Sequence, residues 1–146
     1  MKTLFVALNA KYIHTNLALR SIAKYCQEFS PVIREYTIND SPDNIIASIY
    51  KEKADVVAFS CYIWNWTVIQ QLIVEIHKLL PDMPIWLGGP EVSFDGVELL
   101  KKYPMVTGIM VGEGEETFRQ LLKYYVNECK EKDGALDQIA GLVLSS

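Results

Sequence analysis

The chain has 146 residues, of which 50% are hydrophobic and 22% are charged, a composition typical of one globular domain rather than of a disordered chain. Its formal net charge of −4 at pH 7 provides no basic field for a nucleic acid and no attraction to an anionic membrane. No apolar run reaches the length of a membrane-spanning helix, so neither a nucleic acid nor a membrane is expected as a partner.

The three cysteines are far apart in the sequence. Cys26, Cys61 and Cys129 form no C-x-x-C pair and no even-numbered set of the kind that small secreted domains use for disulfides. They are expected to be reduced thiols, and the chain is expected to be cytoplasmic.

Five short apolar runs are predicted to be β-strands, and helical patterns lie between them. Leu19, Ile22 and Cys26 illustrate the helical spacing after the first run. This alternation predicts an α/β fold, a doubly wound five-stranded parallel sheet with the flavodoxin-like or Rossmann-like strand order 2-1-3-4-5. Arg34 and Glu35 place the second run at an edge. The five runs are Thr3–Leu8, Val32–Tyr36, Val56–Ser60, Pro84–Gly89 and Gly108–Gly112.

A sixth apolar run, "IAGLVL", ends the chain without a following helix. It is expected to be the first strand of a further domain. The predicted organisation is therefore an α/β domain over residues 1–134, and the start of a linker or strand to a missing downstream domain over residues 135–146.

The ligand of an open α/β sheet binds outside the carboxyl ends of its strands. The loops expected there contain no G-x-G-x-x-G after the first strand and no G-x-x-x-x-G-K-[ST], so the dinucleotide and P-loop motifs are missing. Asn9 and Ser60 stand where a phosphate-accepting receiver domain carries acidic residues. The four loops are Asn9–His14, Ser60–Trp66, Gly88–Phe94 and Val111–Glu115.

The last of these loops, in "VGEGEETF", has a glycine turn before a helix. Such a turn can bind phosphate, but Glu113, Glu115 and Glu116 crowd it with negative charge. The carboxylates are expected to cap the helix and to interact favourably with its dipole instead.

The third and fourth strands end in residues that suit a bulky planar ligand. Ser60 brings a hydroxyl, and the consecutive Gly88 and Gly89 leave a gap above the sheet. Trp64 or Trp66, in the loop after the third strand, either covers such a ligand or docks a neighbouring domain.

These motifs together resemble a known family. Ser60-Cys61-Tyr62 followed by Gly88-Gly89 is similar to the S-x-L and G-G elements of cobalamin-binding domains. "LNAKYIHTNLALR", "GGPEVSFD" and "VGEGEETF" resemble the N-terminal domain of cobalamin-dependent radical S-adenosylmethionine (SAM) enzymes, over essentially the whole chain. The resemblance implies that Ser60 hydrogen-bonds the benzimidazole tail of cobalamin and that Gly88 and Gly89 give the tail room. The implied cofactor-binding residues are Asn9, Ala10, Lys11, Tyr12, Ser60, Cys61, Tyr62, Gly88, Gly89, Pro90, Glu91, Gly112, Glu113 and Gly114.

The first loop departs from the pattern of cobalamin mutases and methionine synthases. Their D-x-H-x-x-G motif supplies a histidine to cobalt, whereas Asn9, Lys11 and His14 occupy the three matching positions here. A lysine ammonium must lose its proton before it can coordinate a metal. The resemblance therefore implies base-off cobalamin without a protein histidine ligand, and no residue is assigned to metal binding.

The chain by itself is not expected to be catalytic. It lacks the C-x-x-x-C-x-x-C spacing of a radical SAM enzyme, so the resemblance implies a downstream barrel of the same chain that holds a [4Fe-4S] cluster and SAM. The parent enzyme would perform methyl transfer or related radical chemistry. Two alternatives remain open: a flavin- or nucleotide-binding flavodoxin-like domain, and a non-catalytic interaction module.

Overall fold

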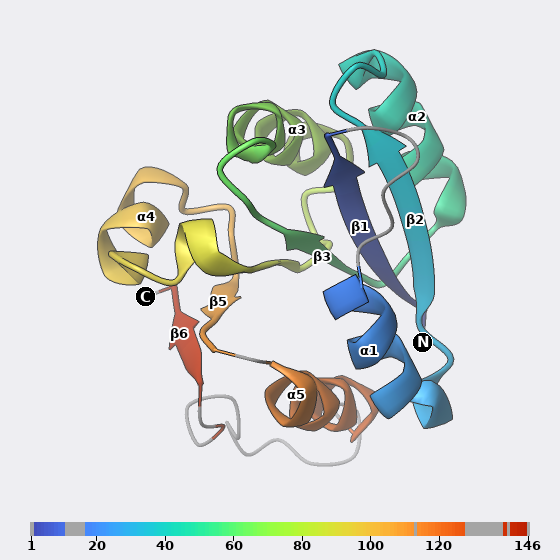
Figure 1. The fold of residues 1–146 in the computed structure, drawn as a ribbon, viewed down its shortest axis with the longest axis vertical. Helices are drawn as coiled ribbons and strands as arrows, with labels where there is room; N and C mark the ends of the chain where they lie inside the picture. The colour runs from blue at the N-terminus through green and yellow to red at the C-terminus, as the bar shows by residue number, and fades with distance from the viewer. Residues whose placement is uncertain (1, 11–16, 113, 128–138, 140, 146) are drawn as a thin grey trace.

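The computed structural model describes residues 2–10, 17–112, 114–127, 139 and 141–145. Within these ranges, strands and helices alternate along the chain as predicted (Figure 1). The strands are β1 (Thr3–Asn9), β2 (Val32–Thr37), β3 (Val56–Ser60), β4 (Ile85–Gly88), β5 (Gly108–Met110) and β6 (Leu142–Leu144). The helices are α1 (Leu17–Tyr25), α2 (Pro42–Glu52), α3 (Trp66–Leu79), α4 (Gly96–Lys102) and α5 (Glu115–Asn127), with short 3-10 turns at Gln27–Phe29 (η1) and Pro90–Val92 (η2).

The six described strands form one sheet in the order β2-β1-β3-β4-β5-β6. The first five are parallel, which confirms the predicted order 2-1-3-4-5. Charged residues on β2 agree with its edge position, where Arg34 pairs with Glu52 and Glu35 pairs with Arg20.

The run Leu142–Leu144 forms the sixth strand. It pairs antiparallel with β5, with Val143 opposite Ile109. β5 would otherwise expose a row of unpaired backbone groups at the sheet edge. The end of the described chain thus extends the same sheet.

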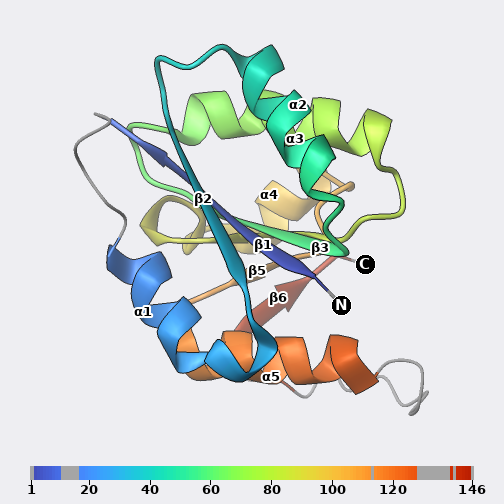
Figure 2. The ribbon, with the colours of Figure 1, turned by 90° about the vertical axis from the view of Figure 1, so that its right-hand side faces the viewer.

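Helices cover both faces of the sheet, giving three layers (Figures 1 and 2). One face packs against α2, α3 and α4, through residues such as Phe59, Ile73 and Leu100. The other packs against α1 and α5, through residues such as Phe5 and Phe118. Because successive strand residues point to opposite faces, the apolar residues of β1 and β3 supply both cores, as expected of central parallel strands.

Two helices begin at residues whose side chains suit an N-cap but make no capping bond. Ser41 and Asp95 are the N-cap residues of α2 and α4, and neither side chain makes a capping hydrogen bond. None of the helices in the described part of the chain is both long and apolar enough to cross a membrane.

Candidate functional site: a cleft at the carboxyl ends of the strands

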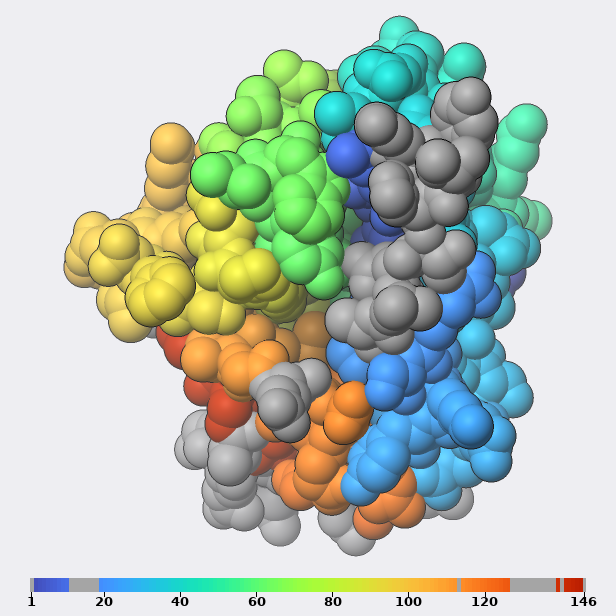
Figure 3. Space-filling view, in the orientation of Figure 1, coloured from blue at the N-terminus to red at the C-terminus, as the bar shows by residue number. Residues whose placement is uncertain are grey.

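A cleft of about 780 Å³ opens at the carboxyl ends of β3, β4 and β5, between the sheet and helices α1 and α5. Its volume lies within the roughly 300–1,000 Å³ typical of small-molecule sites. Figure 3 shows this side of the molecule, where the green loop after β3, the yellow loop after β4, the orange start of α5 and blue α1 surround the cleft. The position agrees with the rule that ligands of open α/β sheets bind beyond the carboxyl ends of the strands.

A row of four residues across the sheet, three of them small, creates the space. Ala7 is in register with Ser60, Ser60 with Gly88, and Gly88 with Met110. All four lie on the α1/α5 face, because they alternate with residues of the opposite core. A Cβ atom added at Gly88 would lie 3.4 Å from Met110 Cε, so the absent side chain of Gly88 is itself part of the open volume.

The next row toward the amino ends of the strands is bulkier and closes the bottom of the cleft. Phe5, Ala58, Trp86 and Gly108 are in register. The Trp86 indole donates from Nε1 to the Tyr125 hydroxyl at 2.9 Å. A Cβ atom at Gly108 would come within 2.5 Å of Trp86 Cζ3, so this glycine makes room for the indole.

Aromatic packing closes the rear of the cleft. The rings of Phe5 and Phe118 meet edge to face with their centroids 4.5 Å apart. Both side chains are buried, and both line the cleft. This contact joins β1 to α5 and sets the depth that a ligand can reach.

The turn after β4 is built against the backbone of β3. Gly89 has φ of +104°, and a Cβ atom there would lie 2.4 Å from the carbonyl oxygen of Cys61. The Cys61 N–H donates to the Gly88 carbonyl at 2.7 Å, and the Cys61 carbonyl accepts from the Glu91 N–H at 3.3 Å. Gly89 is therefore required by the turn itself, and a substitution there perturbs the fold as well as any ligand.

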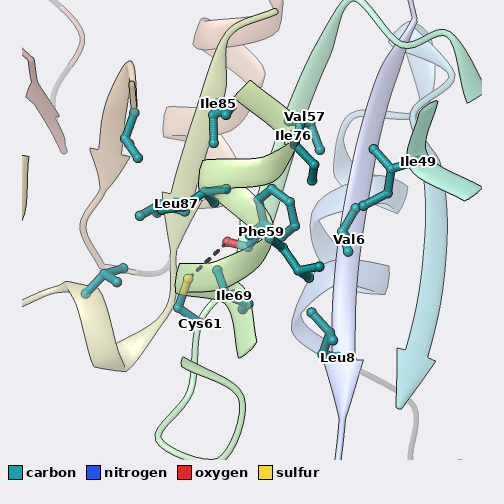
Figure 4. Packing of buried hydrophobic residues seen from close by; sticks show 14 of the residues in the cluster. Val6, Leu8, Ile49, Val57, Phe59, Cys61, Ile69, Ile76, Ile85 and Leu87 are labelled. Carbon is teal, nitrogen blue, oxygen red and sulfur yellow. Dashed lines mark hydrogen bonds between the residues drawn. The ribbon is translucent and has the colours of Figure 1, made fainter. Parts of the chain in front are cut away.

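Cys61 points away from the cleft. Its side chain is fully buried in the core on the α2/α3/α4 face, and its thiol contacts the Phe59 carbonyl at 3.7 Å (Figure 4). Burial raises the pKa of the Cys61 thiol well above its usual range. A protonated, buried thiol on the opposite face is a packing residue.

Asn65, which the sequence reasoning missed, organises the loop after β3. Its side chain is 1% exposed. The Oδ1 atom accepts from the Tyr62 N–H at 2.8 Å, and Nδ2 donates to the carbonyls of Leu8 and Ser60, both at 3.0 Å. One amide thus joins the ends of β1 and β3 to the loop that follows.

The loop after β3 places aromatic rings at the mouth of the cleft. Tyr62 lines the cleft, and its ring stacks on Trp64 with a centroid distance of 4.5 Å and an interplanar angle of 8°. Trp64 is 49% exposed. Trp66 is half-buried and packs edge to face on Tyr103, on the α2/α3/α4 side of the sheet. Of the two tryptophans, Trp64 is the one that stands beside the cleft. Ile63, next to Trp64 in this loop, and Phe94, which lines the cleft, are 80% and 78% exposed. Together with Trp64 they are called the rim below.

The glycine turn before α5 forms as a strand-to-helix turn, with positive φ at both Gly112 and Gly114. Glu115 and Glu116 lie in the first turn of α5, and their side chains bind α1. Glu115 accepts a hydrogen bond from the Ser21 hydroxyl at 2.9 Å, and Glu116 accepts one from the Tyr25 hydroxyl. These bonds join the two helices that form one wall of the cleft.

The structure brings together half of the predicted site residues. Lining the cleft are Ser60, Tyr62, Gly88, Gly89, Pro90, Gly112 and Gly114. Four others lie near the loop ends without contributing to the described lining, namely Asn9, Ala10, Cys61 and Glu91. Lys11, Tyr12 and Glu113 lie outside the described residues, as do His14 and Cys129.

The sequence reasoning missed the apolar lining. Phe5, Leu19, Ile22, Ala58, Met110 and Phe118 all face the cleft, although their sequence pattern is that of ordinary core residues. The one signal that identifies some of them is strand alternation. Ala58 lies two residues before Ser60, and two residues apart on a strand means the same face.

The fold and the cleft define a flavodoxin-like α/β domain with a ligand site at the carboxyl ends of its strands. Residues 3–122 match the model of the B12 binding domain, and the chain belongs to this family. It is 28% identical over 126 residues to the cobalamin-dependent radical SAM methyltransferase TokK of Streptomyces tokunonensis, a match that covers 83% of this chain and 18% of that protein.

Two solved structures share the fold. One is the cobalamin-dependent S-adenosylmethionine radical enzyme OxsB, with a TM-score of 0.76 and 20% identity over 97% of this chain and 20% of that chain. The other is the radical S-adenosylmethionine methyltransferase TsrM from Kitasatospora setae, with a TM-score of 0.76 and 18% identity over 99% of this chain and 28% of that chain. The chain thus spans between 18% and 28% of the length of these relatives.

Proposed function

We propose that this chain holds cobalamin in the cleft, as the cofactor-binding part of a radical SAM enzyme. The observation that carries the proposal is the in-register row of Ala7, Ser60, Gly88 and Met110, which opens a deep slot in a sheet whose family binds B12. The residues present fit the group, because a Cβ atom at Gly88 would enter the space that the cofactor's tail needs.

Different residues of the cleft are proposed to hold different parts of the cofactor. Ser60 donates a hydrogen bond to the tail base, while Phe5 and Phe118 exclude water from the buried end. Gly89, Pro90, Gly112 and Gly114 shape the two turns around the mouth. Asn9, Ala10, Lys11, Tyr12, Glu91 and Glu113 complete the proposed set through the neighbouring loops. Cys61 belongs to the set only through its backbone, which bonds Gly88 and Glu91 at the turn after β4. When bound, cobalamin supplies a cobalt centre that carries a methyl group or controls a radical.

The cofactor is proposed to bind base-off, with its tail in the cleft and no histidine on cobalt. His77 is in the last turn of α3. Since α3 follows β3 after the loop of residues 61–65 and runs back along the sheet, His77 lies at the opposite end of the strands from the cleft. The described part of the cleft lining contains no histidine.

A catalytic partner is proposed for the exposed rim at the mouth. Phe94 lines the cleft, Trp64 stacks on Tyr62 at its mouth, and Ile63 lies between these two rings in the sequence. All three side chains are exposed and apolar, which suits an interaction site. We propose that Trp64 covers the corrin and that the rim faces a downstream barrel of the same protein. The barrel would contribute a [4Fe-4S] cluster and SAM for methyl transfer or related radical chemistry, and residues 135–146 would lead toward it.

The test is cobalamin binding by Gly88 variants, measured by absorbance titration of the purified chain. Gly88→Ala adds a methyl in ordinary contact with Met110, and Gly88→Val fills more of the slot, so affinity should fall stepwise, by about tenfold or more for Gly88→Val, or roughly 1.4 kcal/mol. Gly96→Ala is the matched control, because a Cβ there meets Val143 at an ordinary 3.5 Å outside the cleft. Unchanged affinity in a folded Gly88→Val protein would overturn the assignment of the slot.

A further inference from the structure

The turn between β5 and α5 forms one side of the cleft mouth but has little packing of its own. Val111, Gly112 and Gly114 line the cleft, and the two glycines have φ of +89° and +81°. A Cβ atom added at Gly112 would meet no atom of the described residues within 4 Å, and one at Gly114 would first meet Ile22 Cδ1, at 3.8 Å. Because the backbone of glycine has more conformational freedom than that of any other residue, the shape of this turn must be fixed from outside it.

Gly141 contacts both ends of this turn. On the strand side, its carbonyl accepts a hydrogen bond from the Val111 N–H at 2.7 Å. On the helix side, a Cβ atom added at Gly141 would lie 2.7 Å from Oγ1 of Thr117, in the first turn of α5, and also 3.3 Å from the Val111 carbonyl oxygen. Gly141 itself has φ of +89°, so both the close contacts and the backbone conformation exclude a side chain at this position.

Strand β6 holds Gly141 in place. It lies along β5 at the edge of the sheet (Figure 1), with Leu142 opposite Met110. Leu142 packs on the α1/α5 face of the sheet and Val143 on the other face, and this register places Gly141 beside Val111. β6 follows residue 122, where the match to the B12 binding domain ends, so the anchor of the turn lies outside the matched segment.

We propose that Gly141 is a positioning residue of the cofactor site, and that the cofactor-binding unit of this chain extends through β6. This inference rests on the proposed function. Gly141 is not among the described residues that line the cleft, and it acts by holding the Val111 backbone, so that Gly112 and Gly114 keep the shape that the cofactor meets. Without this hydrogen bond the turn would have to be ordered when the cofactor binds, and the entropy lost in ordering it would weaken binding.

The first measurement is the cobalamin affinity of Gly141→Ala, by absorbance titration of the purified chain. Loss of one backbone hydrogen bond should weaken binding about fivefold, equivalent to about 1 kcal/mol. Gly96→Ala is the matched control, because a Cβ atom there meets Val143 of the same strand at an ordinary 3.5 Å, away from the turn, and its affinity should equal that of the unmodified chain.

A second variant covers the case in which Gly141→Ala does not fold. Gly141→Ala is then made together with Thr117→Ala, which removes the closest contact, and the double variant is compared with Thr117→Ala alone. The positive φ still disfavours alanine at position 141, so a similar fall in affinity is expected.

Amide hydrogen exchange of the chain without cofactor, followed by NMR, separates positioning from a general loss of stability. Exchange reports local opening as well as global unfolding. The exchange rate of the Val111 N–H should rise in Gly141→Ala by more than that of the Cys61 N–H, which is bonded to the Gly88 carbonyl at the same distance of 2.7 Å.

The outcomes distinguish this inference from the function on which it rests. Unchanged cobalamin affinity in a folded Gly141→Ala protein would overturn the positioning role, as would an equal rise in exchange at the Val111 and Cys61 amides. A fall in affinity as large in Gly96→Ala would also overturn it. Failure of the unmodified chain to bind cobalamin would overturn the proposed function instead, and exchange at Val111 would still test the anchor.

Discussion

Replacement of Asn65 tests how the mouth of the cleft is held in place. Its amide makes three hydrogen bonds, to the Tyr62 N–H and to the carbonyls of Leu8 and Ser60, at 2.8 to 3.0 Å. The side chain is 1% exposed, so water cannot replace the lost partners without entry into the core. Asn65→Ala leaves three backbone groups with one partner fewer.

The expected loss of stability follows from these three bonds. A buried hydrogen bond contributes about 1 kcal/mol net, so Asn65→Ala should lower the free energy of unfolding by about 3 kcal/mol. At roughly 2–4 °C per kcal/mol for a domain of this size, the melting temperature should fall by about 6–12 °C. Cobalamin affinity should fall too, because Tyr62 and Ser60 both line the cleft.

Urea unfolding of Asn65→Ala and of a matched control provides the measurement. Asn44, exposed in the first turn of α2, is the control. Asn44→Ala should change the free energy of unfolding by no more than about 0.5 kcal/mol. A loss in Asn65→Ala within that range of the control would refute the reasoning.

Asn65→Asp tests the orientation of the amide. It keeps an acceptor for the Tyr62 N–H but turns a carboxylate oxygen toward the carbonyls of Leu8 and Ser60, where Nδ2 now donates. This variant should be at least as destabilised as Asn65→Ala. A stable Asn65→Asp protein would show that the amide nitrogen does not face these two carbonyls.

Three further predictions concern titration and the cobalt ligand. Burial raises the pKa of the Cys26 thiol from about 9 to about 11, so the stability that the protonated thiol contributes should be lost as pH rises from about 9 through about 11. Cys26→Ala should remove this part of the alkaline loss of stability, measured by urea unfolding at several pH values. Identical pH profiles for the two proteins would contradict the prediction. The hydrogen bond from Tyr25 lowers the pKa of Glu116, so the stability that this bond adds should be lost as pH falls through the lowered pKa. Tyr25→Phe should raise the pKa of Glu116, measured by NMR. An unchanged pKa would count against the hydrogen bond. Electron paramagnetic resonance of bound Co(II) cobalamin should show no axial nitrogen splitting, and splitting that vanishes in His14→Ala would contradict the base-off proposal.

Local patterns along the chain were sufficient to predict the parallel sheet and the edge of it at which the cleft opens. Apolar runs such as Val56–Ser60 are continuous because central parallel strands are buried on both faces. Turn residues such as Gly88 and Gly89 mark the loops, and loops after parallel strands meet at one edge. These signals need only residues near one another in the sequence, and the family resemblance was read from the same segments.

Other features depend on contacts between segments far apart in the sequence. Glu116, in the first turn of α5, accepts a hydrogen bond from Tyr25 of α1, because packing of α1 on α5 places a phenol within reach. The strand Leu142–Leu144 joins this sheet because β5 leaves an edge open to it. Neither the first-turn residues of a helix nor an apolar run predicts which distant segment will pack against it.

The sequence by itself determined the first five strands and the residues Ser60 and Gly88 at their ends, and the predicted strand order was the commoner one for such a sheet. Only the tertiary structure decided which face each residue occupies: Cys61, next to Ser60, points into the opposite core, while Phe5 and Phe118 come together to close the cleft. The physical reason is that alternation along a strand assigns two faces without saying which helices will cover each one. Strand register and helix packing make that choice, and both are set by burial over the whole domain.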